Sequence, residues 1–145
     1  MNDRFISELA LQDAVRFGLE REGNIVLSEF PLLGKIADFF VVGANSCTAI
    51  ECKLKDTGEA VRQARVYQEA ADLVYIAMPS RRRPRGWDTQ LAVMGIGLLE
   101  VREDGVIDVV VEAAHGSPHP TLRDRALAHA EDRLKPESIT GARDA

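Results

Sequence analysis

The stretch from residue 36 to residue 54, IADFFVVGANSCTAIECKL, decides the fold because it has the pattern of two strands joined by a turn. Residues 36–42 are rich in aromatic and β-branched side chains, and residues 48–54 alternate in polarity. The composition of residues 43–46, GANS, is typical of a turn. Both runs are apolar on both faces for much of their length, so we expect helices to cover the sheet on each side.

This hairpin brings three charged residues together. If the turn centres between Ala44 and Asn45, Asp38 lies directly opposite Glu51, and opposed residues on antiparallel strands share a face. Lys53, two residues beyond Glu51, points the same way. Two carboxylates held face to face in a half-buried sheet repel each other. A cation such as Mg²⁺ or Mn²⁺ removes that repulsion and makes a bound water easier to deprotonate, while the lysine can stabilise negative charge on a phosphate.

The rest of the chain predicts alternating helices and strands around this hairpin. The expected elements are a helix over 4–22, a strand over 25–33, a helix over 56–71, a strand over 73–78, a basic loop over 80–87, a helix over 88–94, strands over 98–102 and 106–111, and a helix over 121–134. Pro31 indicates that the first strand lies at a sheet edge. This order favours a mixed α/β sandwich. We expect a main domain over 1–120, then a C-terminal helix and flexible tail over 121–145.

Composition restricts the class of protein. A chain of 145 residues with 46% hydrophobic side chains can bury one core without disulfides. Cys47 and Cys52 are separated by an odd number of positions along one strand, which predicts opposite faces and no bridge. Without a signal peptide or long apolar run, we expect a cytoplasmic protein that does not enter a membrane. The net charge of −5 argues against a nucleic-acid partner, except that metal-binding carboxylates are neutralised in the working state.

The hairpin resembles the active-site motif of the PD-(D/E)xK nuclease superfamily. The residues that carry the resemblance are Asp38 in the first strand and the Glu51-Cys52-Lys53 triplet in the second, with Ala37 where the family usually has proline. The resemblance implies a restriction-endonuclease-like mixed β-sheet core flanked by helices. It also implies a metal-dependent phosphodiesterase that acts on nucleic acid, and we expect DNA in preference to RNA. In such enzymes the aspartate and glutamate bind the metal, and the lysine assists the attacking water.

The resemblance extends to the neighbouring helices. The segment that contains Gln63 and Tyr67 is similar to the helix that follows the motif in many members, where the glutamine faces the site. Tyr67, one turn later, shares that face and is a candidate contact with nucleic acid. In many members a glutamate of the first helix completes the metal shell. Glu8 is the preferred candidate, and Glu20 and Glu29 are the alternatives.

Several assignments stay open at this level. The arginines of the basic loop can clamp a nucleic-acid backbone or simply be solvated: Arg81, Arg82, Arg83 and Arg85. Arg123 lies on a helix of mixed charge, which is typical of a plain surface helix. A second functional hypothesis is an inactive nuclease-fold module that binds nucleic acid or protein, and a third is a scaffold that associates through the apolar stretch 91–99. The resemblance also leads us to expect a homodimer or a targeting partner.

Overall fold

The computed structural model describes residues 7–55, 57–80 and 83–135, within which the chain forms four helices and six strands. In chain order they are α1 (Glu8–Arg21), β1 (Val26–Leu32), β2 (Lys35–Val42), β3 (Cys47–Cys52), α2 (Thr57–Tyr67), β4 (Leu73–Pro79), α3 (Trp87–Met94), β5 (Gly97–Val101), β6 (Ile107–Val111) and α4 (Pro120–Arg133). The structure therefore confirms the expected type and order of these elements. The main difference is that α2 ends at Tyr67, earlier than residue 71.

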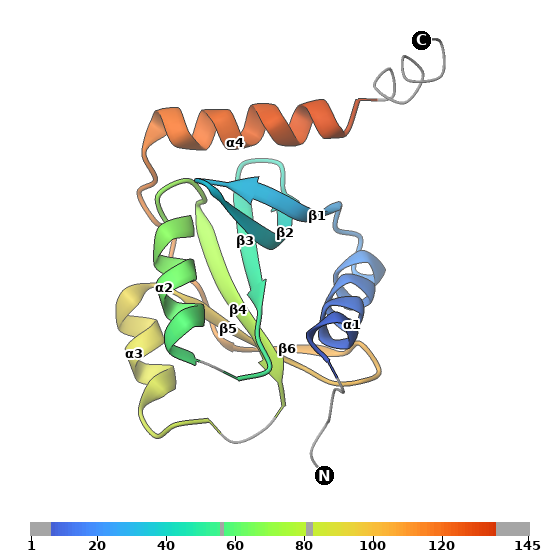
Figure 1. Ribbon diagram of the computed structural model, residues 1–145, viewed down its shortest axis with the longest axis vertical. Helices are drawn as coiled ribbons and strands as arrows, with labels where there is room; N and C mark the ends of the chain where they lie inside the picture. The colour runs from blue at the N-terminus through green and yellow to red at the C-terminus, as the bar shows by residue number, and fades with distance from the viewer. Residues whose placement is uncertain (1–6, 56, 81–82, 136–145) are drawn as a thin grey trace.

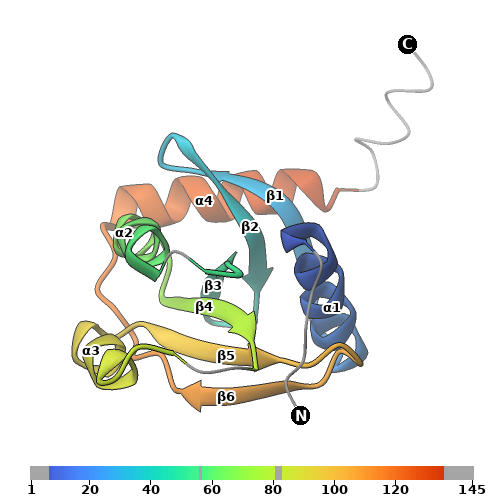
Figure 2. The ribbon, with the colours of Figure 1, turned by 60° about the horizontal axis from the view of Figure 1, so that its bottom comes forward.

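The strands form one mixed sheet in the order β1-β2-β3-β4-β5-β6 (Figure 1). Neighbours pair antiparallel at both ends of this order and parallel where β4 meets β3 and β5. Pro31 lies in the edge strand β1, as expected. Helix α1 covers one face of the sheet, α2 and α3 cover the other, and α4 runs beside β1 and β2 (Figure 2). The result is an α/β sandwich.

The two strands of the central hairpin pair in the predicted register. Phe39 pairs with Ile50 and Val42 pairs with Cys47, as a turn centred between residues 44 and 45 requires. The pairing of β2 with β3 does not extend past Phe39, whereas the first half of β2 stays paired with β1. The two strands therefore separate at Asp38, and we call this point the fork.

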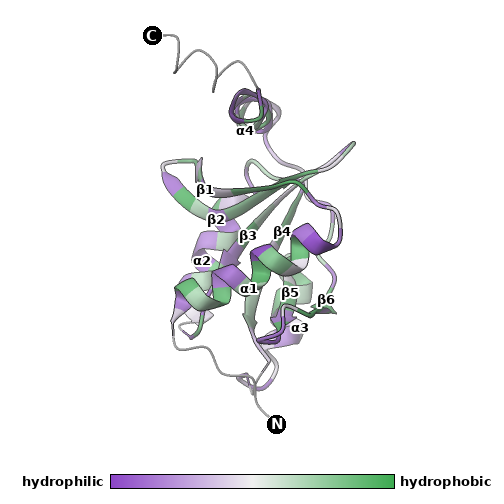
Figure 3. Ribbon diagram, turned by 90° about the vertical axis from the view of Figure 1, so that its right-hand side faces the viewer, coloured by the Kyte–Doolittle hydropathy of each residue, from purple (hydrophilic) through white to green (hydrophobic). Residues whose placement is uncertain are grey.

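Apolar side chains fill both faces of the sheet. The strands are coloured largely hydrophobic, whereas α1 and α2 alternate between hydrophobic and hydrophilic residues (Figure 3). Cys47 belongs to the core beneath α2 and Cys52 to the core beneath α1, which confirms that they face opposite ways. Ala126 and Ala130 of α4 are buried in the first of these cores, so the C-terminal helix packs as part of the main fold. Residues 136–145, the expected tail, lie outside the described residues.

The apolar stretch 91–99 belongs to the interior. Leu91, Ile96 and Leu98 are fully buried, while Val93 is the large hydrophobic side chain that this stretch exposes. The hypothesis that the stretch forms an association surface is therefore wrong, because these side chains already pack in the core. In the part of the chain that the structure describes, every helix is too short or too polar to cross a membrane.

Candidate active site

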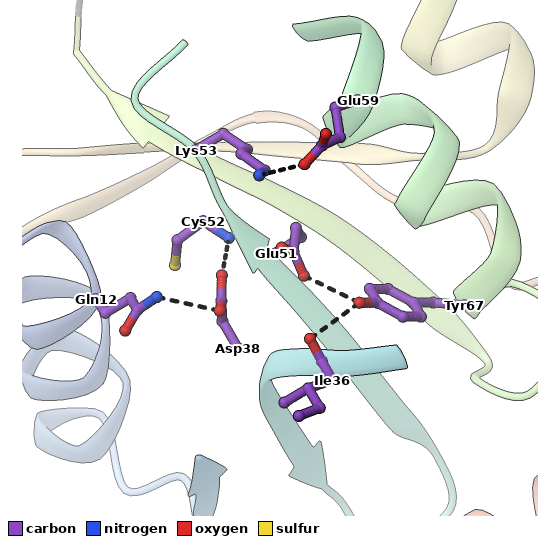
Figure 4. Close-up of polar contacts among 8 residues, drawn as sticks. All are labelled: Gln12, Ile36, Asp38, Glu51, Cys52, Lys53, Glu59 and Tyr67. Atoms are coloured by element: carbon purple, nitrogen blue, oxygen red, sulfur yellow. Dashed lines mark hydrogen bonds and ion pairs between the residues drawn. The ribbon is translucent and has the colours of Figure 1, made fainter. Parts of the chain in front are cut away.

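Side chains replace the missing strand pairing at the fork. Beyond the last pair of β2 with β3, the amide of Cys52 donates to the Asp38 carboxylate, with 2.8 Å between N and Oδ2. Across the opening, the Tyr67 hydroxyl lies 3.2 Å from the carbonyl oxygen of Ile36 (Figure 4). Buried backbone groups must find hydrogen-bond partners, and these contacts supply them. The fork is thus a polar opening within the hydrophobic sandwich.

Glu51 is nearly enclosed in this opening. The residue is only 4% exposed, and its Oε1 lies 3.2 Å from the Tyr67 hydroxyl. That hydroxyl has one hydrogen and two acceptors in reach, Glu51 and the Ile36 carbonyl, and its hydrogen bond to Glu51 works to lower the pKa of this acid. Burial, together with the charge of Asp38, raises the pKa of Glu51 to about 8. Without a cation, Glu51 therefore favours its neutral form at pH 7.

Asp38 is held at both carboxylate oxygens. Oδ2 accepts from the Cys52 amide, and Oδ1 accepts from Nε2 of Gln12 on α1 at 3.1 Å. Burial and the charge of Glu8 raise the pKa of Asp38, although the Cys52 amide and Lys53 oppose this. Asp38 and Glu51 are thus two acids that resist ionising together.

The prediction that Asp38 shares the face of Glu51 and Lys53 holds only in part. The side chains at 51 and 53 contact α2, whereas Asp38 contacts α1. Ala37 and Phe40 both pack in the core beneath α2, although residues three apart on a regular strand face opposite ways. The alternation breaks where the neighbouring strand has Glu29 at a φ of 48°. Asp38 is consequently turned into the fork, between the two faces.

Lys53 is positioned by α2. Its Nζ lies 2.8 Å from Oε1 of Glu59, and its side chain is 13% exposed. Burial by itself would lower the pKa of Lys53, but the hydrogen bond to Glu59 and the charges of Glu8, Glu59 and Glu51 raise it. Lys53 therefore stays an ammonium at neutral pH. Such a group is suited to stabilising negative charge and not to taking a proton.

Gln63 supplies an unpartnered acceptor on the same helix face. Positions 59, 63 and 67 are four residues apart on α2, so Gln63 lies between Glu59, which binds Lys53, and Tyr67, which contacts Glu51. Its buried Oε1 has no hydrogen-bond partner among the described residues. A buried unsatisfied oxygen calls for a donor such as a water or a substrate group. Gln63 therefore stays a candidate for the site, on the face of α2 that contacts Lys53 and Glu51.

The three candidate glutamates have different surroundings. The charge of Glu8, at the start of α1, acts on Asp38 and raises its pKa. Glu20 instead forms an ion pair with Arg16 at 3.3 Å on the exposed side of α1. Glu29 is an exposed residue of β1. Glu8 is therefore the candidate that the fold brings into electrostatic reach of the acids.

The acid pair has the chemistry of a magnesium site with few protein ligands. Over the described ranges, no group of three or more histidine, cysteine, aspartate and glutamate residues is arranged to hold a metal ion. Mg²⁺, however, commonly binds through one or two carboxylates and keeps several waters. Asp38 and Glu51 fit that mode of binding, and Gln63 of α2 has a buried oxygen without a partner among the described residues.

The residues predicted to contact nucleic acid have different surroundings in the structure. Arg83 forms ion pairs with Asp88, at 3.0 Å, and with Glu100, so its charge is balanced within the fold. Arg85 is exposed, and residues 81–82 lie outside the described residues. Tyr67 is fully buried, which corrects the prediction that its ring contacts nucleic acid. Its hydroxyl instead holds the fork together.

No sequence pattern indicated a second buried acid, Asp72. Its carboxylate accepts two hydrogen bonds from Arg123 of α4, at 2.9 and 3.0 Å, and one from the Cys47 amide at 2.9 Å. Arg123 is therefore an anchor of α4, and its assignment to a plain surface helix is wrong. The two partners are 51 positions apart, so no local pattern indicates the pairing.

A hollow of about 500 Å³ lies at the opposite end of the hairpin from the fork. It is lined by the β2–β3 turn and by α4, including Arg123, Leu127 and Glu131. It contains none of the acids of the fork. The geometry of the acids, and not the size of this hollow, therefore identifies the candidate site.

No protein-family description and no curated protein matches the chain. Among solved structures, the chain is similar to the SPO1766 protein of unknown function from Silicibacter pomeroyi, with a TM-score of 0.64 and 23% sequence identity over 86% of each chain. That similarity shows that the mixed α/β fold is shared with an independently solved structure. At this level of identity it carries no functional assignment.

Proposed function

We propose that the chain is a metal-dependent phosphodiesterase of the PD-(D/E)xK nuclease superfamily that cuts nucleic acid, DNA rather than RNA. The observation that carries the proposal is the meeting of Asp38 and Glu51 in the fork, where burial and mutual repulsion oppose their joint ionisation. A fold gains no stability from such an arrangement, but a divalent cation makes it favourable. The mixed sheet between helices is also the architecture that a restriction-endonuclease-like fold implies.

Each residue of the fork has a role in this chemistry. Asp38 and Glu51 hold Mg²⁺ or Mn²⁺, with Glu8 adding negative charge to the shell. A divalent cation held there would supply the activation that lets water act as the nucleophile on a phosphodiester near neutral pH. Lys53, kept protonated by Glu59, stabilises the charge that builds on the phosphate. Gln63 orients the attacking water through its unpartnered oxygen.

Cleavage assays with matched variants test this proposal. The purified full chain is incubated with single-stranded DNA, duplex DNA and RNA in Mg²⁺, Mn²⁺ or EDTA, and Asp38→Asn, Glu51→Gln and Lys53→Met are compared with wild type. We expect metal-dependent cleavage of DNA by wild type and its loss in all three variants. Lys135→Met, an exposed lysine beyond α4, is the matched control and keeps full activity. Undiminished cleavage by Lys53→Met would contradict the role given to Lys53.

The alternative is an inactive module with the same fold. The charge balance favours it, because the chain has a net charge of −5 and Arg83 is already paired with two carboxylates. Binding of DNA depends mainly on unpaired basic groups that contact phosphates. The two functions separate in one experiment: calorimetric Mn²⁺ binding without turnover of any nucleic acid identifies the module.

A further inference from the structure

We propose that Gln12 on α1 is a positioning residue that holds the Asp38 carboxylate ready for the cation; this inference rests on the proposed function. The Nε2 of Gln12 lies 3.1 Å from Oδ1 of Asp38, while the Cys52 amide binds Oδ2 at 2.8 Å. Figure 4 shows both donors at the carboxylate, the Cys52 amide from β3 and the Gln12 amide from α1. Nothing in the sequence motif selects a residue of the first helix for this contact.

Asp38 needs this support because the sheet does not fix it against Glu51. The β2–β3 pairing stops at Phe39, so the segment that carries Asp38 is paired with β1 alone. The ladder of β1 with β2 also skips the position opposite Asp38, where Glu29 has a φ of 48°. The orientation of the carboxylate therefore depends on contacts of the side chain: the Cys52 amide of β3, Gln12 of α1, and a hydrogen bond with Glu51 itself.

Gln12 is well placed to give a fixed contact. Its neighbour Leu11 is fully buried, and so is Val15 one turn later, which anchors this part of α1 against the sheet. Glu8 lies one turn before Gln12 on the same side of the helix, so α1 presents both a donor and a negative charge to Asp38.

The neutral amide suits a carboxylate that must bind a cation. An arginine or lysine at position 12 would neutralise Asp38 and compete with the metal, and an ionised glutamate would repel it. The glutamine amide orients the carboxylate and leaves its charge available, and each oxygen keeps a further lone pair for a cation. Partners of this kind around metal ligands commonly change metal affinity by about 10–100-fold.

The test compares Gln12→Met with Gln90→Met in the full chain. Methionine keeps the length and helix propensity of glutamine but has no donor, and Gln90 is an exposed residue of α3 that serves as control. We expect the Mn²⁺ dissociation constant, measured by calorimetry, to rise about tenfold in Gln12→Met and to stay unchanged in Gln90→Met. Gln12→Leu, which also lacks the donor, shows the same loss if the hydrogen bond is responsible.

A second readout separates positioning from a structural role. We expect DNA cleavage by Gln12→Met at low Mn²⁺ to fall about tenfold and to recover at saturating Mn²⁺, with the KM for DNA unchanged. Equal Mn²⁺ affinity in wild type and Gln12→Met, or a rate that excess Mn²⁺ does not restore, overturns the role of Gln12 alone. A wild-type chain that binds no Mn²⁺ overturns the proposed function and this inference together.

Discussion

Glu51 and Asp72 are the two buried charged side chains in the part of the chain that the structure describes, at 4% and 7% exposure. Their surroundings are opposite. Asp72 accepts hydrogen bonds from Arg123 and the Cys47 amide, and these partners lower its pKa in spite of burial. Glu51 faces a tyrosine hydroxyl and Asp38, and burial with that charge raises its pKa to about 8.

The difference separates an acid that the fold compensates from one that it leaves uncompensated, which we propose is functional. Burial of a carboxylate is tolerated when a cation and donors surround it, and Asp72 meets that condition from within the protein. The Glu51 site lacks that compensation, because Lys53 is shared with Glu59 and a second acid is turned toward it. Buried acids with strongly shifted pKa values and no internal compensation concentrate at functional sites. The charge that satisfies Glu51 is therefore expected to come from a ligand.

The largest expected difference is in activity. Glu51→Gln should slow DNA cleavage by about a thousandfold, because it removes a charge that the cation needs. Asp72→Asn should leave kcat within about twofold of wild type, since Asp72 supports α4 at a distance from the fork. Single-turnover assays well below the unfolding temperature of both variants measure the two rates. A comparable loss in Asp72→Asn would remove the distinction between the acids.

The second difference is in stability. Removing the partner of Asp72 should destabilise the fold, whereas removing the charge of Glu51 should stabilise it. Arg123→Met should lower the free energy of unfolding by about 2–3 kcal/mol, because it leaves the Asp72 carboxylate buried without its cation. The value lies below the range for fully enclosed pairs because the Arg123 side chain is 29% exposed. Urea unfolding at pH 7 measures the change. Arg125→Met, an exposed arginine of the same helix, is the control and should have little effect.

The sequence predicted the elements and the hairpin register because these depend on local patterns. Alternating polarity and a short polar turn place Phe39 opposite Ile50, and helical periodicity marks α1 and α2. The orientation of Asp38 was only partly predictable. It depends on the left-handed backbone of Glu29 in the neighbouring strand, and nothing in the hairpin itself records that conformation.

Contacts between distant segments account for the remaining errors. The pair Asp72–Arg123 joins β4 to α4, and the contact of Gln12 with Asp38 joins α1 to β2. Taken alone, each of these residues is expected at the surface, because aspartate, arginine and glutamine are mostly exposed in proteins. The burial of Tyr67 was missed for a related reason, because one aromatic residue on a helix face does not tell whether it packs inward or contacts a ligand.

A third prediction concerns Glu51 in the absence of metal. Glu51→Gln should raise the free energy of unfolding by about 3 kcal/mol at pH 7 in EDTA, because it removes an acid whose ionisation the fold opposes. The folded state of wild type binds this proton more tightly than the unfolded chain, so its stability falls as pH rises from about 4.5 to about 8. Urea unfolding across this range measures the slope, which Glu51→Gln should reduce to the part that comes from the raised pKa of Asp38.

The same measurement contrasts the two acids. Because the pKa of Asp72 is lowered, its contribution is present above the ordinary value of 3.8 and is lost as pH falls through its lower folded value. Asp72→Asn should therefore weaken the acid-side decline, to which Asp88 also contributes, and retain the slope between about pH 4.5 and 8 that Glu51 causes. A wild-type curve without any decline on the alkaline side would show that Glu51 is not held neutral by the fold.

The smallest expected effect is stabilisation by a divalent cation. At ten times its dissociation constant, Mn²⁺ should stabilise wild type by about 1.4 kcal/mol, which corresponds to an increase of several degrees in Tm. Asp72→Asn should keep this increase because its fork is intact, while Glu51→Gln should lose most of it. Thermal unfolding with Mn²⁺, and with Ca²⁺ as a larger cation, measures the shift. Equal shifts in all three proteins would place the cation away from the fork. A cation bound between Asp38 and Glu51 should stabilise the protein less when Glu51 is replaced and equally well when Asp72 is replaced.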